Sequence, residues 1–421
     1  MQASPRLLFR RRFLPLFTTQ FLGAFNDNLY KTAMVLLVTY HIYSDESREA
    51  AFNALAGGLF ILPFFLFSAI AGQLADGHDK ARIIRIVKTA EIAIMVFGAA
   101  GLLFHSVPLL LAALFAMGVH SSFFGPIKYA ILPQHLRPGE VLGGTGLVEA
   151  GTYGAILLGT IVGGIIPPAA SAGLVLFVAV AGWFTGRAVP PAPPVAATPP
   201  IDRHIIRASI ALVRQTMHIP RLFLAIGAIS FFWAVGAVLA AQFPPLVKNV
   251  LVADQTVATM MLALFSIGVA IGSVLINRLL KGQVSARFAP IAALVMAVFV
   301  ADLWWVTSGW PDHGGDLHDL ATFLRQPGAY RVVFDLFGVA VAGGMFVVPL
   351  YAFLTTTVPA AETARTIAAN NIVNSGAMVL GALLAAGMAL AGFGVAQILL
   401  LVVFGAIGAA IIAQRLHKAC D

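Results

Sequence analysis

The sequence has 421 residues, of which 59% are hydrophobic and only 10% charged, and its mean hydropathy is +0.91. Soluble domains usually carry about a quarter charged residues, so this composition excludes an ordinary soluble protein and predicts a chain that crosses a membrane many times. The formal net charge is +8. Because the basic residues are scattered over short loops and form no single patch, we expect no binding to nucleic acid.

Apolar runs of about 20 residues, the length that an α-helix needs to cross a bilayer, occur twelve times. The first follows a cluster of arginines and is about twice as long as the apolar part of a signal peptide, so we interpret it as an uncleaved first span. The sequence predicts an all-α membrane protein with twelve spans, at residues 13–40, 52–75, 83–104, 107–129, 143–166, 170–187, 221–247, 257–280, 288–309, 331–357, 366–390 and 393–414.

A Pro-rich segment, PPAPPVAATPP at 190–200, divides these spans into six and six and precedes a basic amphipathic stretch at 202–221. We therefore expect two six-helix bundles, at 1–187 and 221–421, joined by a linker and amphipathic helix at 188–220. Nearly all Lys and Arg border loops on one side of these spans. Since basic residues favour the cytoplasmic side, both termini are predicted to be cytoplasmic.

The first span contains FLGAFNDNLYK at 21–31, in which Asp27 and Lys31 lie one helical turn apart. A charge near the bilayer centre costs about 2.5–3.5 kcal/mol, so this polar stripe is expected to face the protein interior or a wet cavity. Two interpretations stay open: the stripe lines a substrate path, or an internal ion pair fixes the span against its neighbours. The candidate ligands here are Asn26, Asp27, Asn28, Tyr30 and Lys31.

Further polar residues interrupt later spans. Lys128 follows a proline in GPIKYAILP, where it either lines the same cavity or extends to the membrane surface. Glu149 in the fifth span corresponds to Asn371 in the eleventh, because short repeats align the two halves: GAILLG at 154–159 with GAMVLG at 376–381. The remaining candidates for the cavity are the other asparagines of the eleventh span, Asn370 and Asn374.

The loop after the second span contains GQLADGHDKAR at 72–82. Gly72 permits close approach of another helix, and Asp76 can bind a helix N-terminus, for which the start of the eleventh span near Arg365 is the expected partner. Lys80 and Arg82 are expected to form pairs across the loop. We interpret the motif as a cytoplasmic latch, and the alternative is an ordinary polar turn.

These motifs, with FFGPIKYAILPQHL at 123–136 and RTIAANNI at 365–372, resemble the lysophospholipid transporter (LplT) family of the major facilitator superfamily. That family includes a transporter domain fused to acyltransferase/acyl-ACP synthetase proteins. The resemblance implies a flippase that moves lysophosphatidylethanolamine and related lipids from the outer to the inner leaflet of the bacterial inner membrane, for reacylation. Asp27 would then bind the ammonium, Lys31 or Lys128 the phosphate, and the asparagines and Tyr30 the glycerol and phosphate oxygens.

The resemblance also implies a monomer that works without a cofactor among membrane lipids. No His in the chain is followed five positions later by Asp, so an acyltransferase motif is absent and we expect a separate acyltransferase/acyl-ACP synthetase to supply the chemistry. We assign no catalytic residue and no metal. Two other functions remain open: a proton-coupled exporter of amphipathic drugs that uses Asp27 or Glu149, and a non-transporting scaffold that recruits an acyltransferase through 186–221.

Overall fold

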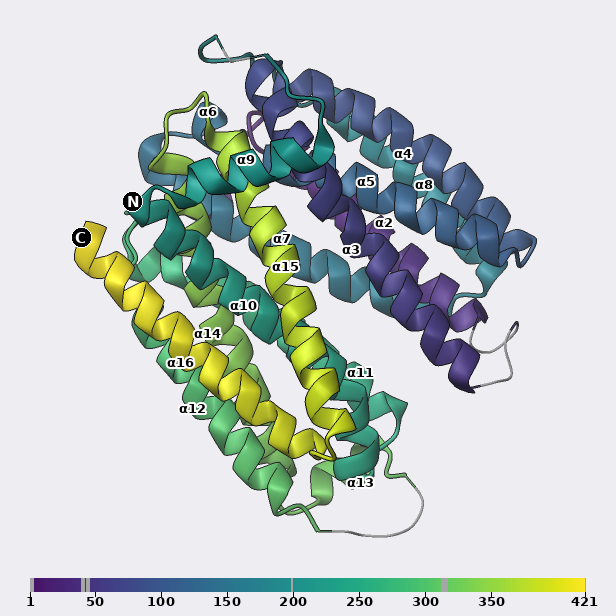
Figure 1. Cartoon of the computed structure of the whole chain (residues 1–421). Helices are drawn as coiled ribbons and strands as arrows, with labels where there is room; N and C mark the ends of the chain where they lie inside the picture. The colour runs from purple at the N-terminus through teal and green to yellow at the C-terminus, as the bar shows by residue number, and fades with distance from the viewer. Residues whose placement is uncertain (1–3, 39–41, 43–45, 198–199, 312–316, 421) are drawn as a thin grey trace. The chain divides into compact units, whose positions relative to one another are not determined.

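The computed structural model describes residues 4–38, 42, 46–197, 200–311 and 317–420. Within these residues, twelve helices are at least 20 residues long (Figure 1). They match the twelve predicted spans in order: α2 (Leu14–Leu37), α3 (Glu46–Gly77), α4 (Lys80–Leu103), α5 (Val107–Ala130), α7 (Pro138–Ile165), α8 (Pro168–Arg187), α10 (Pro220–Pro245), α11 (Gln255–Leu279), α12 (Ala289–Ser308), α14 (Ala329–Thr356), α15 (Thr363–Leu390) and α16 (Val395–Cys420).

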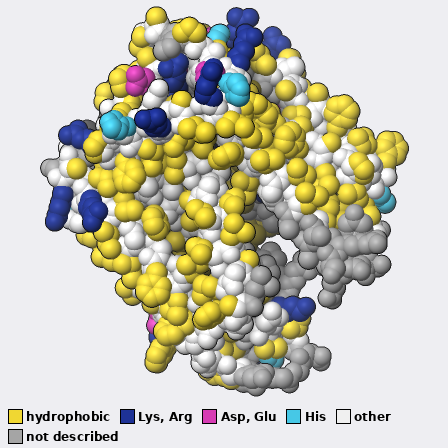
Figure 2. All heavy atoms as spheres, in the orientation of Figure 1, with side chains coloured by type: hydrophobic (Ala, Val, Ile, Leu, Met, Phe, Trp, Pro, Cys, Tyr) yellow, Lys and Arg dark blue, Asp and Glu magenta, His cyan; other side chains and the backbone are white. Residues whose placement is uncertain are grey.

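Eleven of these helices have the length and apolar composition of a membrane span, counted within the described residues. The exception is α2, because the polar sequence NDNLYK lies in its middle. Residues 39 and 40, the predicted end of the first span, lie outside the described residues. Large apolar side chains are exposed on several helices, Phe177 and Phe404 among them, and Figure 2 shows hydrophobic side chains covering much of one face. Such a surface is suited to lipid and not to water.

Contacts divide the chain into two compact units, each described here by itself. The first unit comprises the chain as far as Thr216 together with Leu354–Ser375, and the second comprises Met217–Phe353 and Gly376–Asp421. The predicted boundaries at 187 and 221 remain a prediction. The first part of α15 thus packs with the N-terminal helices, as expected from the predicted contact between Asp76 and the start of the eleventh span.

In the first unit, α2 packs closely against α7, and glycines make this approach possible. A Cβ atom at Gly159 would lie 2.4 Å from the carbonyl oxygen of Phe25, and one at Gly163 would lie 2.7 Å from that of Leu29. α2 also contacts α8, which runs beside α4 (Figure 1). Because α2 is surrounded in this way, its polar side chains are directed into the unit.

In the second unit, α16 packs against both α10 and α12. Glycines join α11 to α14 in a reciprocal contact: a Cβ at Gly272 would lie 2.0 Å from the Val341 carbonyl oxygen, and one at Gly344 would lie 2.3 Å from that of Val269. The interior of this unit is a continuous apolar cluster that includes Phe323. The backbones therefore approach one another where side chains are absent, as is usual for membrane helices.

The predicted basic amphipathic stretch forms α9 (Ile205–Met217). Its Ala208 and Leu212 pack with Ala69 of α3 and Ala368 of α15. Near its start the guanidinium of Arg207 donates two hydrogen bonds of 2.9 Å to the Asp202 carboxylate, and this lowers the pKa of Asp202 to about 2. The helix thus lies on the first unit with its apolar side inward.

The remaining elements are short. They are α1 (Ser4–Leu7), α6 (Leu132–His135), the π-helical turn η2 (Leu246–Val250) and α13 (Leu320–Arg325).

Candidate functional site

Asp27 is the central polar residue of α2. It is half-buried, and its Oδ2 accepts a hydrogen bond of 2.9 Å from the Ser121 hydroxyl on α5. The other carboxylate oxygen, Oδ1, is enclosed and has no hydrogen-bond partner in the described part of the chain. Buried polar atoms are nearly always hydrogen-bonded, so this carboxylate oxygen is exceptional and keeps its capacity to accept a hydrogen bond.

The predicted contact between Asp27 and Lys31 does not form. Lys31 has no carboxylate within 4.0 Å among the described residues, and its Nζ lies 4.6 Å from the centre of the Phe60 ring on α3. A cation above an aromatic face is stabilised without a counter-ion. The two side chains therefore form no direct ion pair in the described structure, although the charge of Asp27 still acts on Lys31.

Lys128, near the end of α5, is also partly buried. Its Nζ lies 4.8 Å from the centre of the Tyr129 ring, and the charges that act on it most are those of Glu149 and Asp27. The hydroxyl of Tyr129 donates a hydrogen bond to Glu149 Oε1. The charged neighbours of Lys128 thus lie inside the unit, on α7 and α2, which favours an interior position over one at the membrane surface.

The asparagines of α15 add amide groups to this interior. The side chain of Asn370 is fully buried, yet neither its Oδ1 nor its Nδ2 has a hydrogen-bond partner among the described residues. A Cβ at Gly125 would lie 3.2 Å from Asn371 Nδ2, so α15 and α5 meet there. Asn374 is also nearly enclosed. The first part of α15 therefore supplies one buried amide, that of Asn370, without a hydrogen-bond partner among the described residues, close to the contact with α5.

Three other predicted ligands have protein partners. Asn28 Nδ2 donates to the Ala24 carbonyl oxygen of its own helix at 2.8 Å. The Tyr30 hydroxyl donates to the Leu110 carbonyl oxygen at 2.9 Å, and Asn26 Nδ2 donates to Glu91 Oε1 at 3.1 Å. Tyr30 and Asn26 are fully buried, so their role as substrate ligands stays a prediction. The alternative is that their hydrogen bonds hold α2 against α5 and α4.

The sequence did not predict a buried charge cluster beside this interior. Glu91 Oε2 lies 2.5 Å from Lys88 Nζ and 3.2 Å from His120 Nε2, and Lys88 Nζ lies 5.6 Å from the Phe124 ring centre. Lys88 and Glu91 are almost completely enclosed. The available signal was their spacing of three residues within one span, which places opposite charges on one helix face.

The predicted partner of Asp76 is confirmed. Its two carboxylate oxygens accept hydrogen bonds from the backbone N–H groups of Ala364, at 2.9 Å, and Arg365, at 3.0 Å. Both belong to the first turn of α15, whose N–H groups have no partner within the helix and carry a partial positive charge. Asp76 is only 1% exposed, so little water competes for these bonds.

The other residues of the loop motif divide into two groups. A Cβ at Gly72 would lie 2.6 Å from Ala368 Cβ, so the predicted close approach of another helix is also present. Lys80 is buried and Arg82 is exposed, and neither has a carboxylate within 4.0 Å in the described residues. Lys80 and Arg82 therefore form no ion pair across the loop among the described residues. Asp76 binds backbone instead, and its Oδ2 also lies 3.9 Å from Arg365 Nε.

Twelve long helices, most of them apolar, with charged side chains enclosed in the first unit, define a polytopic membrane protein. The chain belongs to the Major Facilitator Superfamily, whose model matches residues 16–382. It is similar to "Lysophospholipid transporter LplT" of Serratia proteamaculans, with 28% identity over 356 residues, 82% of this chain and 80% of the relative. LplT of Escherichia coli O1:K1 / APEC is also 28% identical, over 86% of this chain and 84% of the relative.

Solved structures agree on the fold. The human organic anion transporter MFSD10 (TETRAN) has a TM-score of 0.80 and 13% identity, over 96% of this chain and 99% of the other. The Major Facilitator Superfamily transporter FucP has a TM-score of 0.70 and 9% identity, over 97% and 99%. At such identities the likeness shows the architecture alone.

Proposed function

We propose that this transporter is a flippase for lysophospholipids such as lysophosphatidylethanolamine. The observation that carries the proposal is the unpartnered, enclosed oxygen of Asp27 in a unit that also contains Lys31 and Lys128, two partly buried lysines with no carboxylate within 4.0 Å among the described residues. The similarity to relatives named LplT supports the same substrate class.

The polar groups suit a zwitterionic headgroup. An ammonium group would donate to Asp27 Oδ1, and a phosphate would accept from Lys31 or Lys128, in charge-assisted hydrogen bonds. The amides of Asn370 and Asn371 offer both donors and acceptors for the glycerol hydroxyl. Glu149 already accepts from Tyr129, and its role in this proposal is to balance the charge of Lys128.

Transport would proceed by alternating access. The lipid would move from the outer to the inner leaflet of the bacterial inner membrane, where a separate acyltransferase would reacylate it. In this proposal the protein is a monomer with both termini in the cytoplasm, and Asp76, Gly72 and Arg365 form a latch at the start of α15. Because α15 continues into the second unit, release of its first turn would free one unit to move.

The test is flipping of labelled lysophosphatidylethanolamine in proteoliposomes of the pure protein, with and without a pH gradient. Asp27→Asn and Ser121→Ala should each slow flipping, the first by at least tenfold if it removes a charge-assisted bond of about 1.5–3 kcal/mol. The matched control is Ser122→Ala, because the Ser122 hydroxyl donates to the Val119 carbonyl oxygen of its own helix at 2.8 Å.

Headgroup dependence separates this function from the others. Lysophosphatidic acid has no ammonium, so its flipping should not change when Asp27 is replaced. Flipping that requires a pH gradient would indicate a proton-coupled exporter, and folded protein that moves no lipid would indicate a scaffold.

A further inference from the structure

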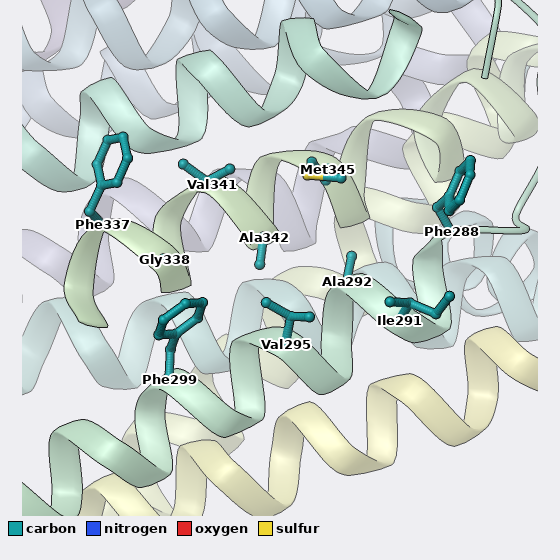
Figure 3. A pocket seen from close by; sticks show the side chains of 10 residues that line it. All are labelled: Phe288, Ile291, Ala292, Val295, Phe299, Phe337, Gly338, Val341, Ala342 and Met345. Carbon is teal, nitrogen blue, oxygen red and sulfur yellow. The ribbon is translucent and has the colours of Figure 1, made fainter. Parts of the chain in front are cut away.

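An apolar groove lies between α12 and α14 in the second unit (Figure 3). Its volume is about 310 Å³, at the lower end of the roughly 300–1,000 Å³ typical of small-molecule pockets. The lining contains no charged or hydrogen-bonding side chain; it consists of Phe288, Ile291, Ala292, Val295, Phe299, Phe337, Gly338, Val341, Ala342 and Met345. The groove is therefore suited to hydrocarbon.

The groove has the proportions of one lipid chain. Figure 3 shows Phe288 at one end and Phe299 with Phe337 at the other, and the rise of α12 from Phe288 to Phe299 is roughly 16 Å. This is about half the ~30 Å thickness of a bilayer's hydrocarbon core. Since α12 begins at Ala289, the groove runs from one membrane surface to the bilayer centre.

The groove is open to lipid along its side. Ile291 is 58% exposed and Val295 is 38% exposed, although both line it. At the far end a Cβ at Gly338 would lie 2.5 Å from the Phe299 ring, so α12 and α14 are in contact there. A flexible chain can enter from the side, whereas a protein helix about 10 Å wide is too broad.

A cation lies at the open end. The Arg287 guanidinium carbon lies 4.7 Å from the centre of the Phe288 ring, which is part of the lining. Arg287 is exposed and has no carboxylate within 4.0 Å among the described residues. A guanidinium with free donors binds phosphate in a bidentate manner.

We propose that this groove holds one acyl chain of an anionic bilayer phospholipid whose phosphate binds Arg287, and that this lipid remains bound and is not transported. Apolar contacts alone give little preference, because lipid tails are as apolar as the side chains around them. Arg287 therefore determines the selectivity, as basic pockets between membrane helices do for anionic headgroups. The lining has no carboxylate or amide for an ammonium, so an anionic headgroup fits better than a zwitterionic one.

The experiment is native mass spectrometry of the full chain, titrated in detergent with dioleoyl phosphatidylglycerol. We expect one tightly bound lipid in the parent protein. Arg287→Gln should weaken its apparent Kd about tenfold, the effect of losing one charge-assisted hydrogen bond. Lys281→Gln, which removes an exposed charge outside the lining, should bind as the parent does.

Filling the groove tests whether an acyl chain occupies it. Ala292→Phe should abolish the bound lipid, whereas Val298→Phe, on the exposed side of α12 and outside the lining, should retain it. Undiminished lipid binding by Arg287→Gln overturns the proposal. This variant still provides a test if Ala292→Phe fails to fold, because it changes only an exposed side chain. Equal affinity for phosphatidylethanolamine, or displacement by equimolar lysophosphatidylethanolamine, would also overturn it. Since it involves neither Asp27 nor transport, its outcome is independent of the proposed function.

Discussion

Replacement of Asp76 should free the first turn of α15. Each of its two hydrogen bonds to backbone N–H groups involves a charged acceptor, and such bonds contribute about 1.5–3 kcal/mol each. Water can replace part of this when the turn opens, so we expect Asp76→Ala to favour opening by about 2.7 kcal/mol, or about a hundredfold. Asp76→Asn keeps one acceptor oxygen, so we expect about half of this free-energy change, which favours opening roughly tenfold.

Cysteine labelling measures this opening directly. The sequence has a single cysteine, Cys420, so Cys420→Ser provides a cysteine-free background. Thr363 begins α15 and is 1% exposed, so Thr363→Cys should react slowly with a maleimide in the detergent-solubilised protein. Adding Asp76→Ala should raise the labelling rate by at least tenfold.

The matched control is Glu362→Gln, which converts an exposed neighbouring carboxylate to an amide and should leave the labelling rate unchanged. If Asp76→Ala labels at the parent rate while its size-exclusion profile shows folded protein, Asp76 does not hold the helix start and the latch proposal fails.

Two further predictions concern stability in detergent, measured by thermal unfolding. Glu91→Gln should destabilise the protein by about 3–5 kcal/mol, because it leaves the Lys88 charge buried without a partner; the double variant with Lys88→Met should recover most of the loss, and an additive loss would contradict this. Gly159→Val should lower the melting temperature, because its Cβ would meet the Phe25 carbonyl oxygen at 2.4 Å and overpacking costs about 1–3 kcal/mol. Gly164→Ala, with no atom within 4 Å, should have almost no effect.

The sequence predicted the fold well because span length is set by the bilayer. The run at 107–129 became α5 (Val107–Ala130), and the run at 288–309 became α12 (Ala289–Ser308). Hydropathy indicates which residues of a helix lie in the hydrocarbon core, and the hydropathy of a segment depends on its local composition alone. The Asp76 contact was also predictable, because an acidic residue at a membrane edge and a helix start form a simple electrostatic pair.

The interior polar contacts were less predictable because they depend on packing between distant segments. The sequence places Lys31 one turn from Asp27, but the fold brings Phe60 under Lys31 and Ser121 to Asp27. The spacing of Lys88 and Glu91 indicates a pair on one face of α4. The contribution of His120 depends on the packing of α5 against α4 and is visible only in the structure.

The position of the Lys88–Glu91 pair affects how the chain enters the membrane. An isolated charge at the centre of a span costs about 2.5–3.5 kcal/mol on insertion scales. Here the opposite charges are three residues apart on α4, so they can neutralise each other while that helix is being inserted, before α5 has been synthesised. His120 is contributed by α5 and can therefore join only afterwards. The order of synthesis thus lets the Lys88–Glu91 part of α4 enter the bilayer without a net charge and complete its buried network later.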